Sequence, residues 1–297
     1  MKGPAIASAD AKRGLRPRIL PLAVSIFAVS ALVGCATLGS PTVAEKNDDA
    51  LYGPSQSNLT SLSEVIDNHP SDPQAYNMRG SAYGETGMND KALADFNKAI
   101  SLDPNYAQAY ANRGLVYRRI NNLDMALADY NKALSLEPAY APAYLGRGIV
   151  YRLQGRTVQS LADFNKTIAL QPNNPEAYFN RGLLYQSQSE HQFAIDDFST
   201  AIGLAPQRAE PWVARALSYL AVGNDSAAAS DLDQAVQLAP ADPKAWASRG
   251  LAYERLGQKD KAAGSYAKAL NLNEKYAPAV AGFARVGGQA GKSYQTF

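Results

Sequence analysis

Residues 72–106 read DPQAYNMRGSAYGETGMNDKALADFNKAISLDPNY, and nearly the same pattern recurs along the rest of the chain. Two residue types mark the repeat at a strict spacing of 34 residues. One is an arginine, found at Arg79, Arg113, Arg147, Arg181, Arg215 and Arg249. The other is a proline, found at Pro70, Pro104, Pro138, Pro172, Pro206 and Pro240. A fixed period of this length predicts an array in which each unit packs only against its neighbours.

Each unit predicts a pair of helices. The first helix of the quoted unit is expected over residues 73–86, because Asp72 can cap its start and Gly87 can end it. The second is expected over residues 90–102, because Pro104 cannot continue a helix. The chain is therefore expected to be helical throughout the array.

Small and aromatic residues also recur at the repeat spacing. Small residues stand where two helices must approach closely, at Gly80, Gly114, Gly148, Gly182, Ala216 and Gly250. One aromatic column on the second helices reads Phe96, Tyr130, Phe164, Phe198, Leu232 and Tyr266. Together with the prolines, these columns resemble those of the tetratricopeptide repeat (TPR) family. The resemblance implies an all-α fold, a right-handed TPR α-solenoid of six full 34-residue helix-turn-helix repeats plus capping helices.

The resemblance covers residues 73–276, which would hold the six repeats. Residues 59–72 are expected to form an N-terminal capping helix, and residues 277–297 a C-terminal capping helix and tail. Capping elements are expected where a repeat array ends, because the last units have no further neighbour.

Two columns depart from the family pattern, and they depart together. The first helices carry Arg where the family usually has Leu, and the second helices carry Asp where it usually has an apolar residue. In the repeat fold these positions face one another, so we expect a ladder of partly buried pairs. The pairs are Arg79 with Asp95, Arg113 with Asp129, Arg147 with Asp163, Arg181 with Asp197, and Arg215 with Asp231. The alternative is that each Arg reaches solvent and each Asp lies on a wet face.

The N-terminal residues 1–34 have the order of a secretory signal peptide, which is basic, then apolar, then small. Residues 32–35 read Leu-Val-Gly-Cys and resemble the lipobox of bacterial lipoproteins, which implies a signal peptide of that type and acylation of Cys35. Residues 35–58 would then be the lipidated cysteine and a flexible tether. An uncleaved anchor, or an ordinary signal peptide with a chance cysteine, is the alternative.

Charge and composition argue against several function classes. The formal net charge of +2 includes five cations and one anion within residues 1–34, so the remainder has 24 cations against 26 anions. A balance of this kind argues against nucleic acid as the main partner. The histidines, His69 and His191, lie far apart, and no nucleotide-binding motif occurs. We expect no metal, no cofactor and no catalytic residues, and hence no enzyme.

In TPR proteins the first helices line a concave groove, and the resemblance carries groove positions onto this chain. The residues expected in the groove are Asn112, Arg118, Arg119, Leu145, Ile149, Arg152, Phe179, Asn180, Leu183 and Val213. An apolar strip beside a basic cluster suits a protein or peptide with apolar anchors and an acidic flank. The alternative is that the row with Ile149 and Leu183 packs between units as core, and that the arginines are simply solvated.

The sequence resembles outer-membrane TPR lipoproteins that act as adaptors. This implies an exported, lipid-anchored scaffold, facing the periplasm, that binds a partner in its groove and recruits cell-envelope (murein) enzymes. The alternative is a biogenesis, pilotin-like or chaperone factor for the assembly of an envelope machine. Dimerisation through the capping helices is a further expectation that the sequence leaves open.

Overall fold

The computed structural model describes residues 56–289, 291 and 294. Within them the chain is helical and contains no strand, as the sequence predicts. The helices are α1 (Gln56–Asn68), α2 (Pro73–Glu85), α3 (Asn89–Leu102), α4 (Ala107–Arg119), α5 (Leu123–Leu136), α6 (Ala141–Leu153), α7 (Thr157–Leu170), α8 (Pro175–Ser187), α9 (His191–Leu204), α10 (Ala209–Ala221), α11 (Asp225–Leu238), α12 (Pro243–Arg255), α13 (Lys259–Leu272) and α14 (Ala277–Arg285). The expected signal peptide, Cys35 and most of the tether lie outside the described residues.

The helix ends follow local chemistry. Three first helices begin at Pro after an Asp or Asn whose side chain accepts a hydrogen bond from the helix; for α2, the Gln74 amide donates to Asp72 at 2.8 Å. The turn between the two helices of a unit needs one residue with positive φ. Glycine supplies it in four units, as at Gly87 with φ of 76°, and Asn121 and Ser189 supply it in the other two.

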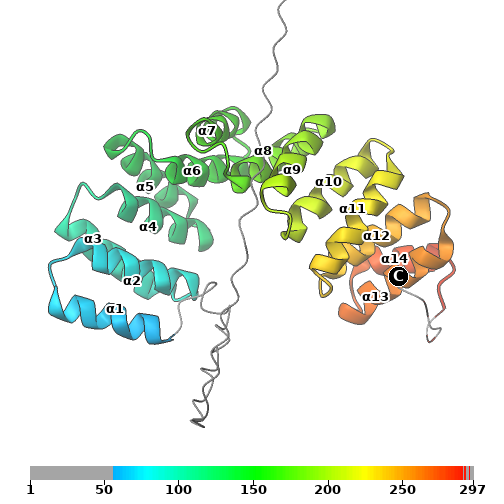
Figure 1. Cartoon of the computed structure of the whole chain (residues 1–297), viewed down its shortest axis with the longest axis horizontal. Helices are drawn as coiled ribbons and strands as arrows, with labels where there is room; N and C mark the ends of the chain where they lie inside the picture. Colours follow the sequence, from blue (N-terminus) through cyan, green and yellow to red (C-terminus); the bar gives the residue numbers. More distant parts are fainter. Residues whose placement is uncertain (1–55, 290, 292–293, 295–297) are drawn as a thin grey trace, which may run out of the picture. The chain divides into compact units, whose positions relative to one another are not determined.

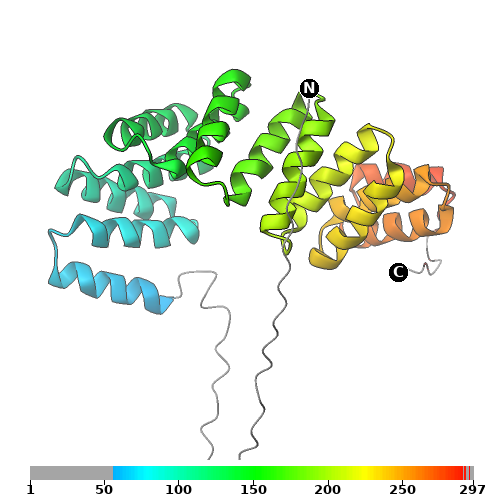
Figure 2. The ribbon, with the colours of Figure 1, turned by 45° about the horizontal axis from the view of Figure 1, so that its top comes forward.

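Contacts between helices define an inner face. Each even-numbered helix from α2 to α12 packs against its odd-numbered partner and also against the even-numbered helix of the next unit (Figures 1 and 2). Odd-numbered helices in the described part do not contact one another. The array therefore bends toward the even-numbered helices, which line the inner face. None of the described helices is long and apolar enough to cross a membrane.

The core inside five of the six units packs an aromatic ring against a glycine. Phe164 of α7 is fully buried against Gly148 of α6. A Cβ atom added at Gly148 would lie 2.8 Å from the Phe164 ring, so the two helices can approach this closely only over glycine. A glycine packs against an aromatic ring in the same way in four other units, and the fifth unit has Ala216 and Leu232 at these positions.

Arginine and aspartate pair within each of the first five units. In the third unit, Arg147 Nε donates to Asp163 Oδ2 at 2.8 Å and its Nη2 donates to Oδ1 at 2.8 Å. The other four pairs expected from the sequence have the same two-pronged geometry, with distances of 2.7–2.9 Å. The Asp side chains are only 6–9% exposed. The hydrogen bonds to Asp163 raise the pKa of Arg147 although burial opposes the rise.

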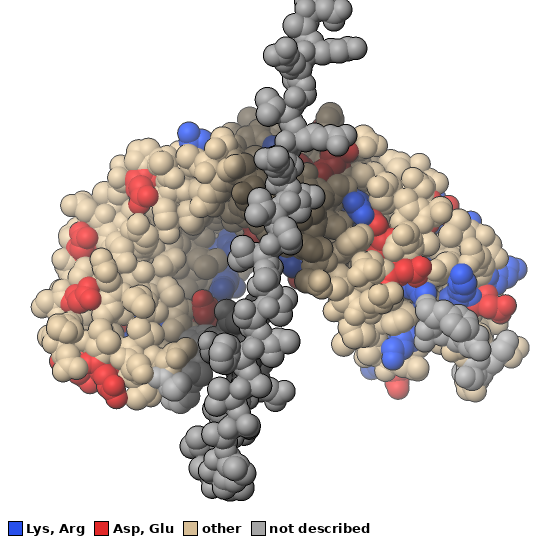
Figure 3. Space-filling model, in the orientation of Figure 1, with Lys and Arg blue, Asp and Glu red and all other residues tan. Residues whose placement is uncertain are grey.

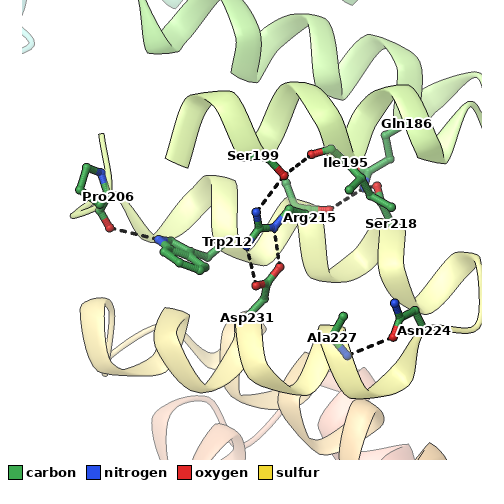
Figure 4. A network of polar contacts seen from close by, with 11 residues as sticks. Gln186, Ile195, Ser199, Pro206, Trp212, Arg215, Ser218, Asn224, Ala227 and Asp231 are labelled. Atoms are coloured by element: carbon green, nitrogen blue, oxygen red, sulfur yellow. Dashed lines mark hydrogen bonds and ion pairs between the residues drawn. The ribbon is translucent and has the colours of Figure 1, made fainter. Parts of the chain in front are cut away.

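Each of these arginines also reaches back to the preceding unit. Arg215 donates from Nη1 to the Ser199 hydroxyl at 2.8 Å, while Asp231 holds its other two nitrogens (Figure 4). Its guanidinium also lies over the ring of Trp212, 5.2 Å from the centroid. In the other units the preceding acceptor is Ser63, Asn97, Asn131 or Asn165. One side chain therefore fixes how two neighbouring units stack.

The sixth unit reverses this arrangement. Its second helix has Ser265 where the others have Asp, and Arg249 Nη1 donates to the Ser265 hydroxyl at 3.1 Å. The carboxylate comes instead from the preceding unit, where Asp233 accepts from Arg249 Nε at 2.6 Å. The hydroxyl of Tyr253 also donates to Asp233. Asp233 stands in the column that holds Asn or Ser in earlier units. The sixth unit has thus lost its own aspartate at Ser265, and Asp233 of the fifth unit provides the carboxylate instead.

Loss of one ladder carboxylate should destabilise the protein strongly. We expect Asp197→Ala to lower the free energy of unfolding by about 3–5 kcal/mol, because it leaves a partly buried guanidinium without its counter-ion. The control is Asp196→Ala, the neighbouring exposed residue on the same helix, which should change it by less than about 0.5 kcal/mol. Denaturant titration measures both, and equal effects would contradict the structural role of the pair.

The reversed pair can be tested by restoring the common arrangement. Asp233→Asn should cost about 3 kcal/mol of unfolding free energy, because Arg249 is buried and loses its carboxylate. Adding Ser265→Asp should recover most of this loss, since the sixth unit would then match the third. Denaturant titration of the two single variants and the double variant gives the coupling free energy between the two positions. Additive effects would show that the two positions do not share one arginine.

Candidate functional site

The inner face of the described part of the chain is hollowed between α8 and α10. A pocket of about 670 Å³ lies between α8 and α10, bounded by the loops that precede α10 and α12. Its apolar wall is formed by Phe179, Leu183, Val213 and Leu217. Its polar rim is formed by Gln186, Gln207, Arg208, Glu210, Asp242 and Lys244. The pocket is thus apolar at its base and carries both charges at its edge.

Ion pairs hold the rim on one side. Arg208, in the loop before α10, pairs with Glu176 of α8 and lies 3.7 Å from Glu210. Its guanidinium also lies over the Phe179 ring, 5.7 Å from the centroid. Phe179 in turn packs on the buried Phe198 with ring centroids 5.9 Å apart. Phe179, in the apolar wall, therefore packs on the core on one side and is covered by the ion-paired Arg208 on the other.

A second hollow of about 320 Å³ adjoins the first and shares Leu217 and Lys244 with it. It lies against α12 and α14, and Leu251, Tyr276 and Ala281 contribute to its lining. The two hollows extend along the inner face from α8 to α14. Figure 3 shows that charged side chains are sparse on the visible side of the array and that both signs occur together over its C-terminal helices.

A polar cluster fastens α14 onto the last unit. Arg285 donates to both carboxylate oxygens of Glu254, at 2.8 and 3.0 Å, and the Tyr266 hydroxyl donates to the same carboxylate at 2.6 Å. The hydrogen bonds from Arg285 lower the pKa of Glu254. Burial, followed by the bond to Glu254, raises the pKa of Tyr266. This cluster keeps α14 in place as the last wall of the inner face.

The structure places the expected groove residues in different surroundings. Phe179, Leu183 and Val213 line the first pocket. Leu145 and Ile149, on α6, are half-buried and lie outside both hollows. The rim residues Gln207 and Arg208 lie in the α9–α10 loop, outside the first helices on which the family pattern places groove positions. Pro206, which ends α9, was the available signal that a loop follows there.

The two asparagines of the expected groove make hydrogen bonds inside the protein. Asn112 donates to Asn77 at 3.0 Å and to Ser81 at 3.3 Å, which links α4 to α2. Asn180 is buried, and its amide donates to the Glu176 carbonyl at 2.9 Å. Asn112 therefore connects two helices of the array, whereas the Asn180 amide donates within α8.

The three arginines of the expected basic cluster have different surroundings. Arg119 donates to the carbonyl of Gly84 near the end of α2, and Arg255 makes the equivalent bond to Leu220 at 2.8 Å. Cations suit the carboxyl ends of helices. Arg152 has only a 3.4 Å bond from Nη2 to Asn180. The Nε atoms of Arg118 and Arg152 are buried and have no hydrogen-bond acceptor.

Nothing in the described residues assembles a metal site, since no group of three or more His, Cys, Asp and Glu side chains lies close together. The chemistry that the described inner face offers is recognition. It has apolar pockets, paired charges at their rim, and two arginines without a counter-ion.

Family models match much of the array. A model described as TPR repeat matches residues 80–121 and 150–189. Models described as tetratricopeptide repeat match residues 107–140, 175–208 and 243–276. No curated protein matches the sequence.

Solved structures share the fold. A chain of the APC/C hetero-tetramer Cut9–Hcn1 is 20% identical with a TM-score of 0.70, covering 77% of this chain and 46% of that one. The pilF protein of Pseudomonas aeruginosa is 19% identical with a TM-score of 0.66, over 72% of this chain and 97% of that one. The MamA protein is 29% identical with a TM-score of 0.51, over 58% and 93%. This chain thus spans less than half the length of the first of these.

Proposed function

This chain belongs to the tetratricopeptide repeat family, and we propose that it is a non-catalytic scaffold that holds a segment of a partner protein on its inner face. Members of this family bind protein or peptide partners. The observation that carries the proposal is the pocket between α8 and α10, where Phe179, Leu183, Val213 and Leu217 form an apolar wall inside a charged rim. An apolar hollow with a polar rim is the usual form of a protein recognition site.

The dimensions of the site favour a segment over a small molecule. The two hollows adjoin, so one extended or helical segment can place successive apolar side chains in both. The rim carries Arg208 and Lys244 together with Glu210 and Asp242, which can orient the polar groups of such a segment. Ion pairs already formed around Arg208 keep the rim ordered before the partner arrives, which lowers the entropic cost of binding.

The scaffold is proposed to act at the bacterial cell envelope, anchored by lipid on Cys35 and facing the periplasm from the outer membrane. The support is the sequence before the array, where a basic and apolar leader is followed by Leu-Val-Gly-Cys at residues 32–35. More than one acyl chain on this cysteine would hold the protein firmly on the membrane. The proposed partners are murein enzymes of the envelope, which the scaffold would recruit. Association of two copies through α1 and α14 stays a prediction.

Lipidation can be tested by moving the thiol. In cells fed a clickable palmitate analogue, the native protein should become labelled and remain with membranes after high-salt washing. Cys35→Ser should abolish labelling. The double change Cys35→Ser with Ser40→Cys, which restores a thiol a few residues away, should not recover it. Labelling of that double variant would contradict a lipobox centred on Cys35.

Partner binding can be tested from the pocket rim. A photocrosslinking amino acid, p-benzoylphenylalanine, in place of Gln207 of the full chain should give discrete adducts in cells, because Gln207 is exposed at the pocket. The same amino acid in place of Gln192, exposed on the odd-numbered helix α9, is the matched control. The change Leu217→Asp, introduced with the crosslinker at Gln207, should remove the adducts while the helical content stays unchanged.

Mass spectrometry of the adducts decides between partner classes. A murein hydrolase or synthase would support the proposed role in recruiting envelope enzymes. A component of a secretin or pilus machine would favour the assembly-factor alternative. Equal adducts from both crosslinker positions, or adducts that survive Leu217→Asp, would contradict binding in this pocket.

A further inference from the structure

Two half-buried arginines of the described array, Arg118 and Arg152, have no carboxylate partner. Among the described residues, every other buried or half-buried arginine lies against a carboxylate. These are Arg79, Arg113, Arg147, Arg181, Arg208, Arg215 and Arg249. Arg118 and Arg152 are half-buried, and no ion pair involves either of them. Arg119 and Arg156 are exposed, so the absence of a carboxylate costs them little.

Arg118 and Arg152 occupy equivalent positions at the carboxyl ends of α4 and α6, 34 residues apart. Burial, followed by the nearby charge of Arg118, lowers the pKa of Arg152. The Nε–H groups of both are buried without an acceptor. Buried donors without partners are unfavourable, and two adjacent cations add repulsion. An anion bound between them would remove both costs.

The unit that follows each arginine offers it few hydrogen-bond acceptors, so an acceptor from a partner can bind. Arg152 donates a hydrogen bond to the Asn180 side chain, 28 residues later in the sequence. Gln186, in the same column, donates to the Ala214 carbonyl, also 28 residues later. The residue 28 positions after Arg118 is Gly146, which has no side chain to offer. The ring of Tyr130 occupies the space beside this glycine. Arg118 hydrogen-bonds to the Tyr130 side chain, whose hydroxyl is no counter-ion.

Arg152 lies close to the apolar pocket, and Arg118 lies one unit before Arg152. Gln186 lines the pocket, and it stands in the same column as Arg118 and Arg152, one unit after Arg152. Asn180, which accepts from Arg152, is adjacent to the pocket residue Phe179 on α8. A partner segment seated in the pocket and continuing toward α6 would therefore pass the two guanidinium groups.

We propose that Arg118 and Arg152 together bind an acidic side chain, Asp or Glu, of the same partner segment whose apolar side chain fills the pocket between α8 and α10. This inference rests on the proposed function, because it requires a segment on the inner face. Guanidinium groups bind carboxylates through two parallel hydrogen bonds, which is how arginines of this array already hold their own aspartates. A partner segment must therefore carry an acidic residue at a fixed distance from the apolar residue that the pocket binds.

The test is selection from a phage library of random 16-residue peptides on the full chain held in detergent. Enriched peptides should share an apolar residue and an Asp or Glu at a constant separation from it. Binding of the best peptide, synthesised and fluorescently labelled, is then measured on the native chain, on two double variants of charged residues and on Leu217→Asp. The double variant Arg118→Gln with Arg152→Gln should bind it about tenfold more weakly or worse, and should no longer select the acidic residue.

The matched control is Arg156→Gln with Lys166→Gln, which removes the same charge from exposed positions at the start of α7 and along it. It should leave both affinity and selection unchanged. An apolar motif without a fixed acidic residue, or an equal loss of binding in both double variants, would overturn the inference and leave the pocket intact. Peptides that bind Leu217→Asp as well as the native chain, or no enriched motif at all, would overturn the inference and the proposed function together.

Discussion

The stacking of this array depends on a guanidinium group shared between two units. In the first five units each arginine, such as Arg215, is held by a carboxylate of its own unit, by a polar side chain of the element before, and between two aromatic rings of its own helix. These contacts are directional, unlike the apolar contact usual at this position. They fix rotation and spacing of neighbouring units, and so determine how the even-numbered helices meet along the inner face.

Much of the fold follows from the sequence because a strict period repeats each signal several times. The pairing of Arg147 with Asp163 could be predicted because both columns change together in five units. The partner of Arg249 could not, because Asp233 lies 16 residues before the arginine and the other aspartates lie 16 after. The clue was the coincidence of Ser265 with a carboxylate in a column of Asn and Ser.

The candidate site was less accessible to sequence reasoning. Phe179 and Val213 could be placed because a helix position determines which way a side chain faces. Arg208 could not, because it belongs to a loop whose course depends on the helices around it. The basic cluster was visible as a set of charges, but its members act differently. Arg119 closes a helix end, whereas Arg118 and Arg152 are distinguished only by partners that they lack, which no sequence pattern records.

The reversed pair at Arg249 also limits how the length of this protein can change in evolution. The first four units supply their own aspartate and a neutral acceptor for the next arginine, so any of them can be duplicated or deleted without stranding a charge. The sixth unit can follow only a unit that carries the carboxylate of Asp233. Deleting the fifth unit alone would therefore remove the carboxylate that Arg249 binds.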